Sequence, residues 1–218
     1  MKLALGTVQF GLDYGITNSG GQVQVDEVRK ILNLAKKNNI NTLDTASDYG
    51  NSEQVLGNIG VDDYQVVTKT IPLTTSVNEV VQAFHQSLEN LNIAKVEGLL
   101  VHDIGDTENK QFNILFVALN ALKQQGLVNK IGFSTYTPEH VNFLLEYFDF
   151  DLIQLPFNVF DTRLVEGGQL RNLKNKAVEI HARSVFLQGL LLDFDHLEDY
   201  FSNWKNEFNA YQKIVKES

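Results

Sequence analysis

Short apolar runs alternate with longer segments of helical period along nearly the whole chain, and no other feature constrains the fold as strongly. The runs predict seven strands, at residues 3–5, 41–44, 65–69, 98–102, 130–134, 152–155 and 180–184. Some are apolar at successive positions, as at Leu99, Leu100 and Val101, which is typical of parallel strands buried on both faces. The alternation therefore predicts a parallel sheet with a right-handed helical crossover after each strand.

The segments between the runs carry helix start and stop signals. Ser76 is placed to cap the start of one helix, and Thr137 followed by Pro138 is placed to begin another. Gly126 is placed to end the helix before it. Because no Gly-, Pro- or Ser-rich linker divides the 218 residues, and 43% of them are hydrophobic, we expect a single domain over 1–218.

The last segment of the chain predicts one more helix and no further strand. Its large apolar residues are spaced by three and four, which gives a broad apolar face, at Phe201, Trp204, Phe208, Tyr211 and Val215. We therefore expect an α/β fold of the TIM type, a (β/α) barrel with seven recognisable strands and the eighth missing. The first and seventh strands would be open edges. We expect the last helix to pack over the seventh strand and its neighbouring helix, and a second copy to cover the remaining gap as a homodimer.

Composition narrows the partners and the compartment. The formal net charge of −9 argues against nucleic acid or an anionic membrane as a partner. No stretch approaches the roughly 20 apolar residues of a membrane span, and the N-terminal residues do not form a signal peptide, so we expect a cytoplasmic protein. The chain has no cysteine, and its histidines show no paired-ligand spacing, so no metal site is expected; they are His85, His102, His140, His181 and His196.

Polar residues end three consecutive predicted strands. These are Asp44, Lys69 and His102, and Tyr49 lies five residues beyond Asp44. In a parallel barrel the active site forms at the C-terminal ends of the strands, and neighbouring strands are about 4.8 Å apart. Any one of these side chains alone would most simply be a solvated surface group. The four together predict a shared pocket.

The stretch LDTASDYGNSEQVLG, from Leu43 to Gly57, closely resembles the signature of the aldo-keto reductase family around its catalytic Asp and Tyr. The opening LALGTVQFG resembles the first strand of that family, VVTKT carries its Lys and LLVHD its His. IGFST, LIQLPFN and RSVFLQGLLL resemble its later strands on the nicotinamide side. The resemblance runs in order from Leu3 to Leu192 and implies an NADPH-dependent enzyme, with NADH as the other cofactor, that reduces a carbonyl compound to an alcohol.

The resemblance implies roles for the four strand-end residues. Tyr49 would exchange the proton with the substrate oxygen, although an unperturbed phenol has a pKa of about 10. A neighbouring ammonium favours the phenolate, so we expect Lys69 to lower the pKa of Tyr49. Asp44 would pair with Lys69 and keep it charged. His102 would orient the substrate oxygen and help to move the proton.

The resemblance also implies a cofactor site at the later strands. Ser134 and Gln154 match positions that hold the nicotinamide carboxamide, and Thr135 stands where the family has an Asn. Ser184, Leu187 and Gln188 match the loop that lies along the pyrophosphate. The eighth strand and the segment that binds the adenosine 2′-phosphate have no counterpart.

Arg183 departs from the family pattern, which has a stacking aromatic residue at this position. A guanidinium plane can also stack, and its fixed charge can bind a carboxylate or a phosphate. The alternative is an internal ion pair.

Two functional hypotheses stay open at this point. The first is a working reductase for a small-molecule carbonyl, and GTVQFGLDYGITN resembles reductase-like proteins of bacterial polysaccharide and sugar biosynthesis, which suggests a sugar-derived substrate. The second is a barrel with weak or no cofactor binding that serves as a binding or scaffold protein, or a fragment of a longer reductase.

Overall fold

The computed structural model describes residues 3–192 and 199–217. Its strands are β1 (Ala4–Gly6), β2 (Thr42–Asp44), β3 (Gln65–Lys69), β4 (Val96–Val101), β5 (Val128–Ser134), β6 (Leu152–Pro156) and β7 (Glu179–Arg183). Its α-helices are α1 (Val8–Gly11), α2 (Val25–Lys37), α3 (Ser52–Ile59), α4 (Val77–Leu91), α5 (Phe112–Gln124), α6 (Pro138–Tyr147), α7 (Arg163–Glu166), α8 (Gln169–Asn175) and α9 (Lys205–Glu217). Three short 3-10 helices are η1 (Ile104–Glu108), η2 (Leu187–Gly189) and η3 (Asp199–Trp204).

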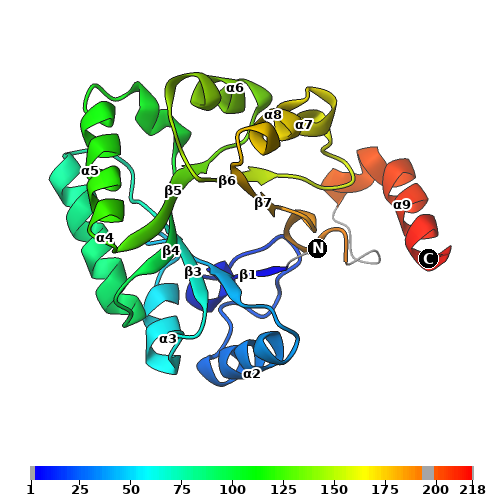
Figure 1. The fold of residues 1–218 in the computed structure, drawn as a ribbon. Helices are drawn as coiled ribbons and strands as arrows, with labels where there is room; N and C mark the ends of the chain where they lie inside the picture. Colours follow the sequence, from blue (N-terminus) through cyan, green and yellow to red (C-terminus); the bar gives the residue numbers. More distant parts are fainter. Residues whose placement is uncertain (1–2, 193–198, 218) are drawn as a thin grey trace.

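The seven strands form one parallel sheet in which each strand pairs with its neighbours in chain order, from β1 to β7. Figure 1 shows the sheet curled into an incomplete ring with the helices outside it. Within the described ranges, no further strand pairs with the free edges of β1 and β7. The prediction of a TIM-type barrel that lacks one strand–helix unit is therefore confirmed.

The core follows from two-sided burial of the strands. Leu99 and Val101 face the large cluster between the sheet and the helices, whereas Leu100 joins Val67 and Leu152 in a small cluster of its own. All five side chains are fully buried. The space around the small cluster is narrow, since a methyl group added at a nearby β4 glycine would lie 2.8 Å from Leu152. Small and large side chains must therefore alternate here to fill the interior without strain.

The helix signals act where the sequence places them. Ser76 Oγ accepts a hydrogen bond from the backbone N–H of Glu79 at the start of α4. Thr137 Oγ1 does the same for His140 at the start of α6, where Pro occupies the first turn. Gly126 adopts φ +77° shortly after α5, a left-handed conformation that glycine takes without a steric cost.

The segment after β7 reaches toward the loop that follows β1. Thr17 Oγ1 donates a hydrogen bond to the Gln188 carbonyl at 3.4 Å. At Gly189, with φ +100°, an added Cβ would lie 1.9 Å from Thr17 Oγ1. Ser184, Leu187 and Gln188 also have left-handed backbone, with φ values of 57°, 46° and 56°. A strained turn and side-chain contacts thus bridge part of the gap between β7 and β1.

The last helix packs elsewhere than predicted. Phe208 of α9 is buried with Leu190 and Leu191, which follow β7, and its ring meets Phe160 in the loop after β6. In Figure 1, α9 lies outside the ring of strands. Trp204, in the preceding 3-10 helix, stays 45% exposed, so the expected continuous apolar face is only partly used. The prediction that the helix covers β7 and its neighbouring helix was wrong, because its aromatic partners come from the loops at the strand ends.

Candidate active site

The residues singled out from the sequence gather at one end of the barrel. Asp44, Lys69 and Ser134 end β2, β3 and β5, and His102 directly follows β4. Tyr49 lies in the turn after β2. Since all strands are parallel, these positions share the C-terminal end of the sheet, where barrel enzymes build their sites.

Lys69 is the centre of the hydrogen-bond network at this end. Its side chain is 1% exposed, and its Nζ donates to Asp44 Oδ1 and to the Thr45 carbonyl, each at 2.8 Å. Gln154 Nε2 also donates to Asp44 Oδ1, at 2.6 Å, from β6 on the other side of the ring. A buried ammonium requires such partners, because an unpaired buried charge is strongly destabilising. Asp44 and Lys69 therefore form the expected pair, and Gln154 adds an unexpected third member.

Tyr49 is held beside this pair by the close approach of two backbone segments. The following Gly50 has φ +57°, and an added Cβ there would lie 2.4 Å from the Gly11 carbonyl oxygen. Lys69 Nζ lies 4.9 Å from the centroid of the Tyr49 ring. The His102 ring meets the Tyr49 ring edge-on, with centroids 6.0 Å apart. Tyr49, Lys69 and His102 thus lie close together, with the ammonium near the ring.

The protonation of Tyr49 differs from the expectation. Burial raises the pKa of its hydroxyl above the usual value, and the Asp44 carboxylate raises it further, whereas the Arg183 guanidinium lowers it. The expected lowering of this pKa by Lys69 is not found, since burial and the Asp44 carboxylate dominate and raise it. Tyr49 is therefore a neutral phenol at neutral pH, able to donate a proton.

His102 is set to remain neutral. Burial lowers the pKa of its imidazole, and the Lys69 charge lowers it further, while Asp48 opposes both effects. Asp48 Oδ2 lies 3.7 Å from His102 Nδ1 but is half exposed to solvent. A neutral imidazole has one N–H, so it can donate one hydrogen bond to a substrate oxygen.

The predicted carboxamide site lies at the ends of β5 and β6. Ser134, Thr135 and Gln154 are all buried there, and the Thr135 N–H donates to the Gln154 carbonyl at 2.9 Å. Thr135 Oγ1 is buried and has no hydrogen-bond partner. Such an unpaired hydroxyl costs stability unless something else completes it.

Arg183, at the end of β7, turns toward β5. Its Nη2 donates to the Thr135 carbonyl at 3.2 Å, and its Nη1 donates to Ser184 Oγ at 3.3 Å. Its guanidinium carbon lies 3.9 Å from the centroid of the Tyr136 ring. Within the described part of the chain it makes no ion pair, so the alternative of an internal ion pair finds no support.

The three residues predicted to lie along the pyrophosphate belong to the turn after β7, which contacts the loop after β1. Leu187 packs against the cluster around Phe208, and the Gln188 carbonyl accepts from Thr17. The Ser184 carbonyl accepts from Asn158 Nδ2 at 3.3 Å. These three residues lie together in one turn, separate from the hydrogen bonds of Lys69.

The sequence analysis did not identify Tyr14 and Tyr136 as residues of the site. Both contribute to the electrostatic environment of the Tyr49 hydroxyl, and both are partly exposed. Tyr136 follows β5 by two residues, and this strand-end position was a usable signal. Tyr14 lies in a glycine-rich loop, and its sequence spacing gives no comparable sign.

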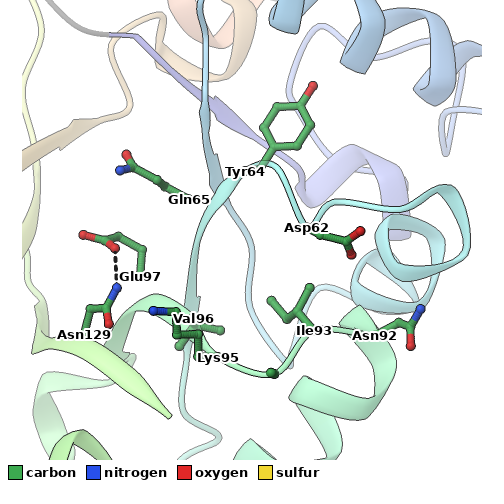
Figure 2. A pocket seen from close by; sticks show the side chains of 10 residues that line it. Asp62, Tyr64, Gln65, Asn92, Ile93, Lys95, Val96, Glu97 and Asn129 are labelled. Atoms are coloured by element: carbon green, nitrogen blue, oxygen red, sulfur yellow. Dashed lines mark hydrogen bonds between the residues drawn. The ribbon is translucent and has the colours of Figure 1, made fainter. Parts of the chain in front are cut away.

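A hollow lies at the opposite end of the barrel, where β3, β4 and β5 begin. It has a volume of about 480 Å³ and is lined by side chains that include Tyr64, Lys95 and Glu97. Figure 2 shows these side chains and the hydrogen bond, 2.8 Å long, from Asn129 to Glu97. At this end, residues of a barrel usually serve stability, so the hollow is a poor candidate for the site.

Neither a metal centre nor a membrane span is found in the described ranges. No cluster of three His, Asp or Glu side chains is arranged there to hold an ion. No described helix combines the length and the apolar character that crossing a membrane requires. His196 lies outside the described residues.

The family model named Aldo/keto reductase family matches residues 2–217. The chain is 29% identical over 176 residues to the glyoxal reductase of Bacillus subtilis, covering 77% of this chain and 61% of that protein's length. It is 26% identical over 193 residues to an uncharacterized oxidoreductase of the same organism, covering 82% of this chain and 67% of the other.

Solved structures with the same fold extend the comparison. A putative aldo-keto reductase of Pseudomonas aeruginosa superposes with a TM-score of 0.70 at 26% identity, covering 83% of this chain and 72% of that one. The glycerol dehydrogenase of Gluconobacter oxydans superposes with a TM-score of 0.74 at 21% identity, covering 98% and 74%. At 21% identity the latter likeness concerns the fold alone.

Proposed function

The chain belongs to the aldo/keto reductase family, and on that premise we propose that it is an NADPH-dependent oxidoreductase that reduces an aldehyde or ketone to an alcohol. The observation that carries this proposal is the convergence of Tyr49, Lys69 and His102 beside Asp44 at one end of the barrel. A sugar-derived carbonyl remains our proposal for the substrate, on the sequence resemblance alone.

The protein residues supply the acid chemistry of the reaction. Tyr49, as a neutral phenol, gives its proton to the carbonyl oxygen as that oxygen gains negative charge. His102 donates a hydrogen bond that orients the same oxygen. The phenolate left on Tyr49 regains a proton from solvent, which its raised pKa favours.

The end of the site near β5 and β6 fits the nicotinamide of the cofactor. Ser134, Thr135 and Gln154 offer hydroxyl and amide groups that match a carboxamide. Because the buried Thr135 Oγ1 has no hydrogen-bond partner in the protein, we expect the ligand to supply one. Ser184, Leu187 and Gln188 would lie along the pyrophosphate, and the outer face of Arg183 would stack on the ring. When bound, NADPH would supply the hydride that reduces the carbonyl carbon. These contacts involve the nicotinamide half of the cofactor, which NADPH and NADH share, so NADH is the alternative cofactor.

Replacing one hydroxyl tests the proposal. In Tyr49→Phe the proton donor is lost while the ring remains, so carbonyl reduction should fall about 10²- to 10⁴-fold with cofactor binding nearly unchanged. Reduction is followed by the loss of NADPH absorbance, and binding by NADPH fluorescence. Tyr147→Phe is the matched control, because Tyr147 is an exposed residue of α6. Turnover retained in Tyr49→Phe would remove Tyr49 from its proposed role.

A scaffold role is the second candidate, and one contact favours it. The amide nitrogen of Gln154 is already hydrogen-bonded to Asp44, which leaves fewer of its groups for a nicotinamide. In that case the protein would bind neither NADPH nor NADH in the fluorescence titration. Cofactor binding with no reduction of any carbonyl compound would also favour this candidate.

We also propose that a second copy covers the free edges of β1 and β7 as a homodimer. Free parallel edges carry unpaired backbone groups that invite association. Light scattering on the purified chain should give the mass of a dimer. A monomer at every concentration tested would contradict this proposal and leave the enzymatic one untouched.

A further inference from the structure

Arg183 has no ion-pair partner among the residues that the structure describes. Lys69, the buried cation of the site, is paired with the Asp44 carboxylate. Arg163, a second arginine at the strand ends, is paired with Asp161. Arg183 instead donates to two neutral acceptors, the Thr135 carbonyl and Ser184 Oγ. Among residues 3–192 and 199–217, the charge of Arg183 therefore has no carboxylate partner.

The guanidinium of Arg183 is held in place, and some of its N–H donors make no hydrogen bond. One of its faces rests on the Tyr136 ring, at 3.9 Å, and the two neutral hydrogen bonds set its orientation. A guanidinium has five N–H donors, of which these bonds use two. Its Nε is buried without a partner. An oriented arginine with free Nη hydrogens on a stacking platform is the arrangement that binds a carboxylate by a fork.

The position of Arg183 decides which anion it would meet. Its backbone pairs with β6, and its side chain contacts the residue after β5, so the charge lies at the strand ends where we place the nicotinamide. It acts on the Tyr49 hydroxyl and on the His102 imidazole electrostatically. The phosphates of a nicotinamide dinucleotide are separated from the hydride-bearing carbon by a ribose. With the pyrophosphate along the turn after β7, an anion that Arg183 binds beside the nicotinamide would belong to the substrate.

We propose that Arg183 binds a carboxylate of the substrate, so that the substrate class is a carbonyl compound bearing a carboxylate, such as an oxo acid. This rests on the proposed reductase function and deepens it. The Arg183 fork would position the carboxylate while Tyr49 and His102 hold the carbonyl oxygen. The reaction itself is unchanged: the carbonyl carbon gains a hydride from the cofactor, and its oxygen gains the proton of Tyr49.

Substrates that differ only in a carboxylate charge test this role of Arg183. Glyoxylate and succinate semialdehyde are compared with their methyl esters, which keep the carbonyl and remove the negative charge. The wild-type protein should reduce each acid more efficiently than its ester. Arg183→Gln should raise KM for the acids roughly tenfold to a hundredfold more than it raises KM for the esters. Arg183→Lys keeps the charge without the fork and should lie between the two. Arg171→Gln removes an exposed arginine of α8 and should match the wild type.

A binding measurement without turnover separates the two proposals. Butanoate should raise the melting temperature of the wild-type protein, butanamide should not, and Arg183→Gln should abolish the difference. If no carbonyl compound is reduced, the proposed function fails, and this measurement still decides the role of Arg183. If the variant does not fold, as judged by circular dichroism, Arg183→Lys carries the comparison. Equal losses for acids and esters, or equal shifts with both probes, would overturn the inference.

Discussion

The two sides of the barrel mouth treat their polar groups differently. On the β2–β4 side, Lys69 and Asp44 satisfy each other within a buried network. On the β5–β7 side, buried polar atoms stand without partners, among them Thr135 Oγ1 and Arg183 Nε. Native proteins leave few such atoms unpaired, and those that persist call for an explanation. Asp106 Oδ2, after β4, is a further unpaired atom, so the contrast concerns the Lys69–Asp44 network, which is complete by itself, and the Thr135–Arg183 region, which is shaped for a ligand.

The largest effect is expected from breaking the network of the complete side. Lys69→Met leaves the Asp44 carboxylate without its ammonium, in a site where both groups are shielded from solvent. We expect the free energy of unfolding to fall by about 3–5 kcal/mol, measured by urea denaturation, with loss of activity. Lys36→Met, which removes an exposed pair with Asp63, should change little. Equal stability of the two variants would mean that the β2–β4 network is not stabilising.

A smaller effect is expected at the bridge between β7 and β1. In Gly189→Ala the new methyl meets Thr17 Oγ1 as well as an unfavourable positive φ, so we expect a loss of about 1–3 kcal/mol in the same measurement. Gly60→Ala is the control, because its φ of +94° is also unfavourable but an added Cβ there meets no atom within 4 Å. The excess loss at Gly189 should be reduced by Thr17→Ala. Equal losses at the two glycines would show that the bridge contributes nothing.

The smallest change in stability is expected from replacing the buried Thr135 hydroxyl, which has no hydrogen-bond partner. Thr135→Val removes a buried group that has no partner, so we expect the free energy of unfolding to stay the same or rise by up to about 1 kcal/mol. Cofactor affinity should fall roughly tenfold in the fluorescence titration.

The control for that variant is Thr68→Val on the other side of the mouth. The Thr68 hydroxyl is equally buried but donates to Glu53 at 2.7 Å, so its removal should cost about 1–3 kcal/mol. If Thr135→Val destabilised the protein as much as Thr68→Val, the distinction between the two sides would be lost.

Sequence reasoning reached those parts of the fold and the site that depend on local pattern. The strands and the capping at Ser76 and Thr137 follow from period and residue type, and the parallel order then brings Asp44 and Lys69 together. The bond from Gln154 to Asp44 could not be foreseen, since it joins residues 110 positions apart across the ring. How far the sheet curls determines that contact, and no local signal encodes the curl.

Two errors have the same origin in tertiary context. The pKa of Tyr49 was predicted to fall because Lys69 is nearby, but burial and the Asp44 carboxylate raise it. The apolar face of the last helix was predicted to cover β7, yet Phe208 finds Phe160 and the segment after β7 instead. In each case the residue types were identified, and their partners depended on contacts that sequence spacing does not specify.

The incomplete ring has a consequence for the timescales of motion. The strands at its two free edges, β1 and β7, each have a ladder on one side only, and their side chains are largely exposed or half buried. Local opening in proteins begins where few buried contacts oppose it, so fluctuations should be frequent at these edges and rare in β3 and β4. Lys69 and His102 thus belong to the slowly exchanging part of the molecule. Arg183, at the end of β7, belongs to the fast part, so its backbone amide should exchange with solvent sooner than that of Lys69.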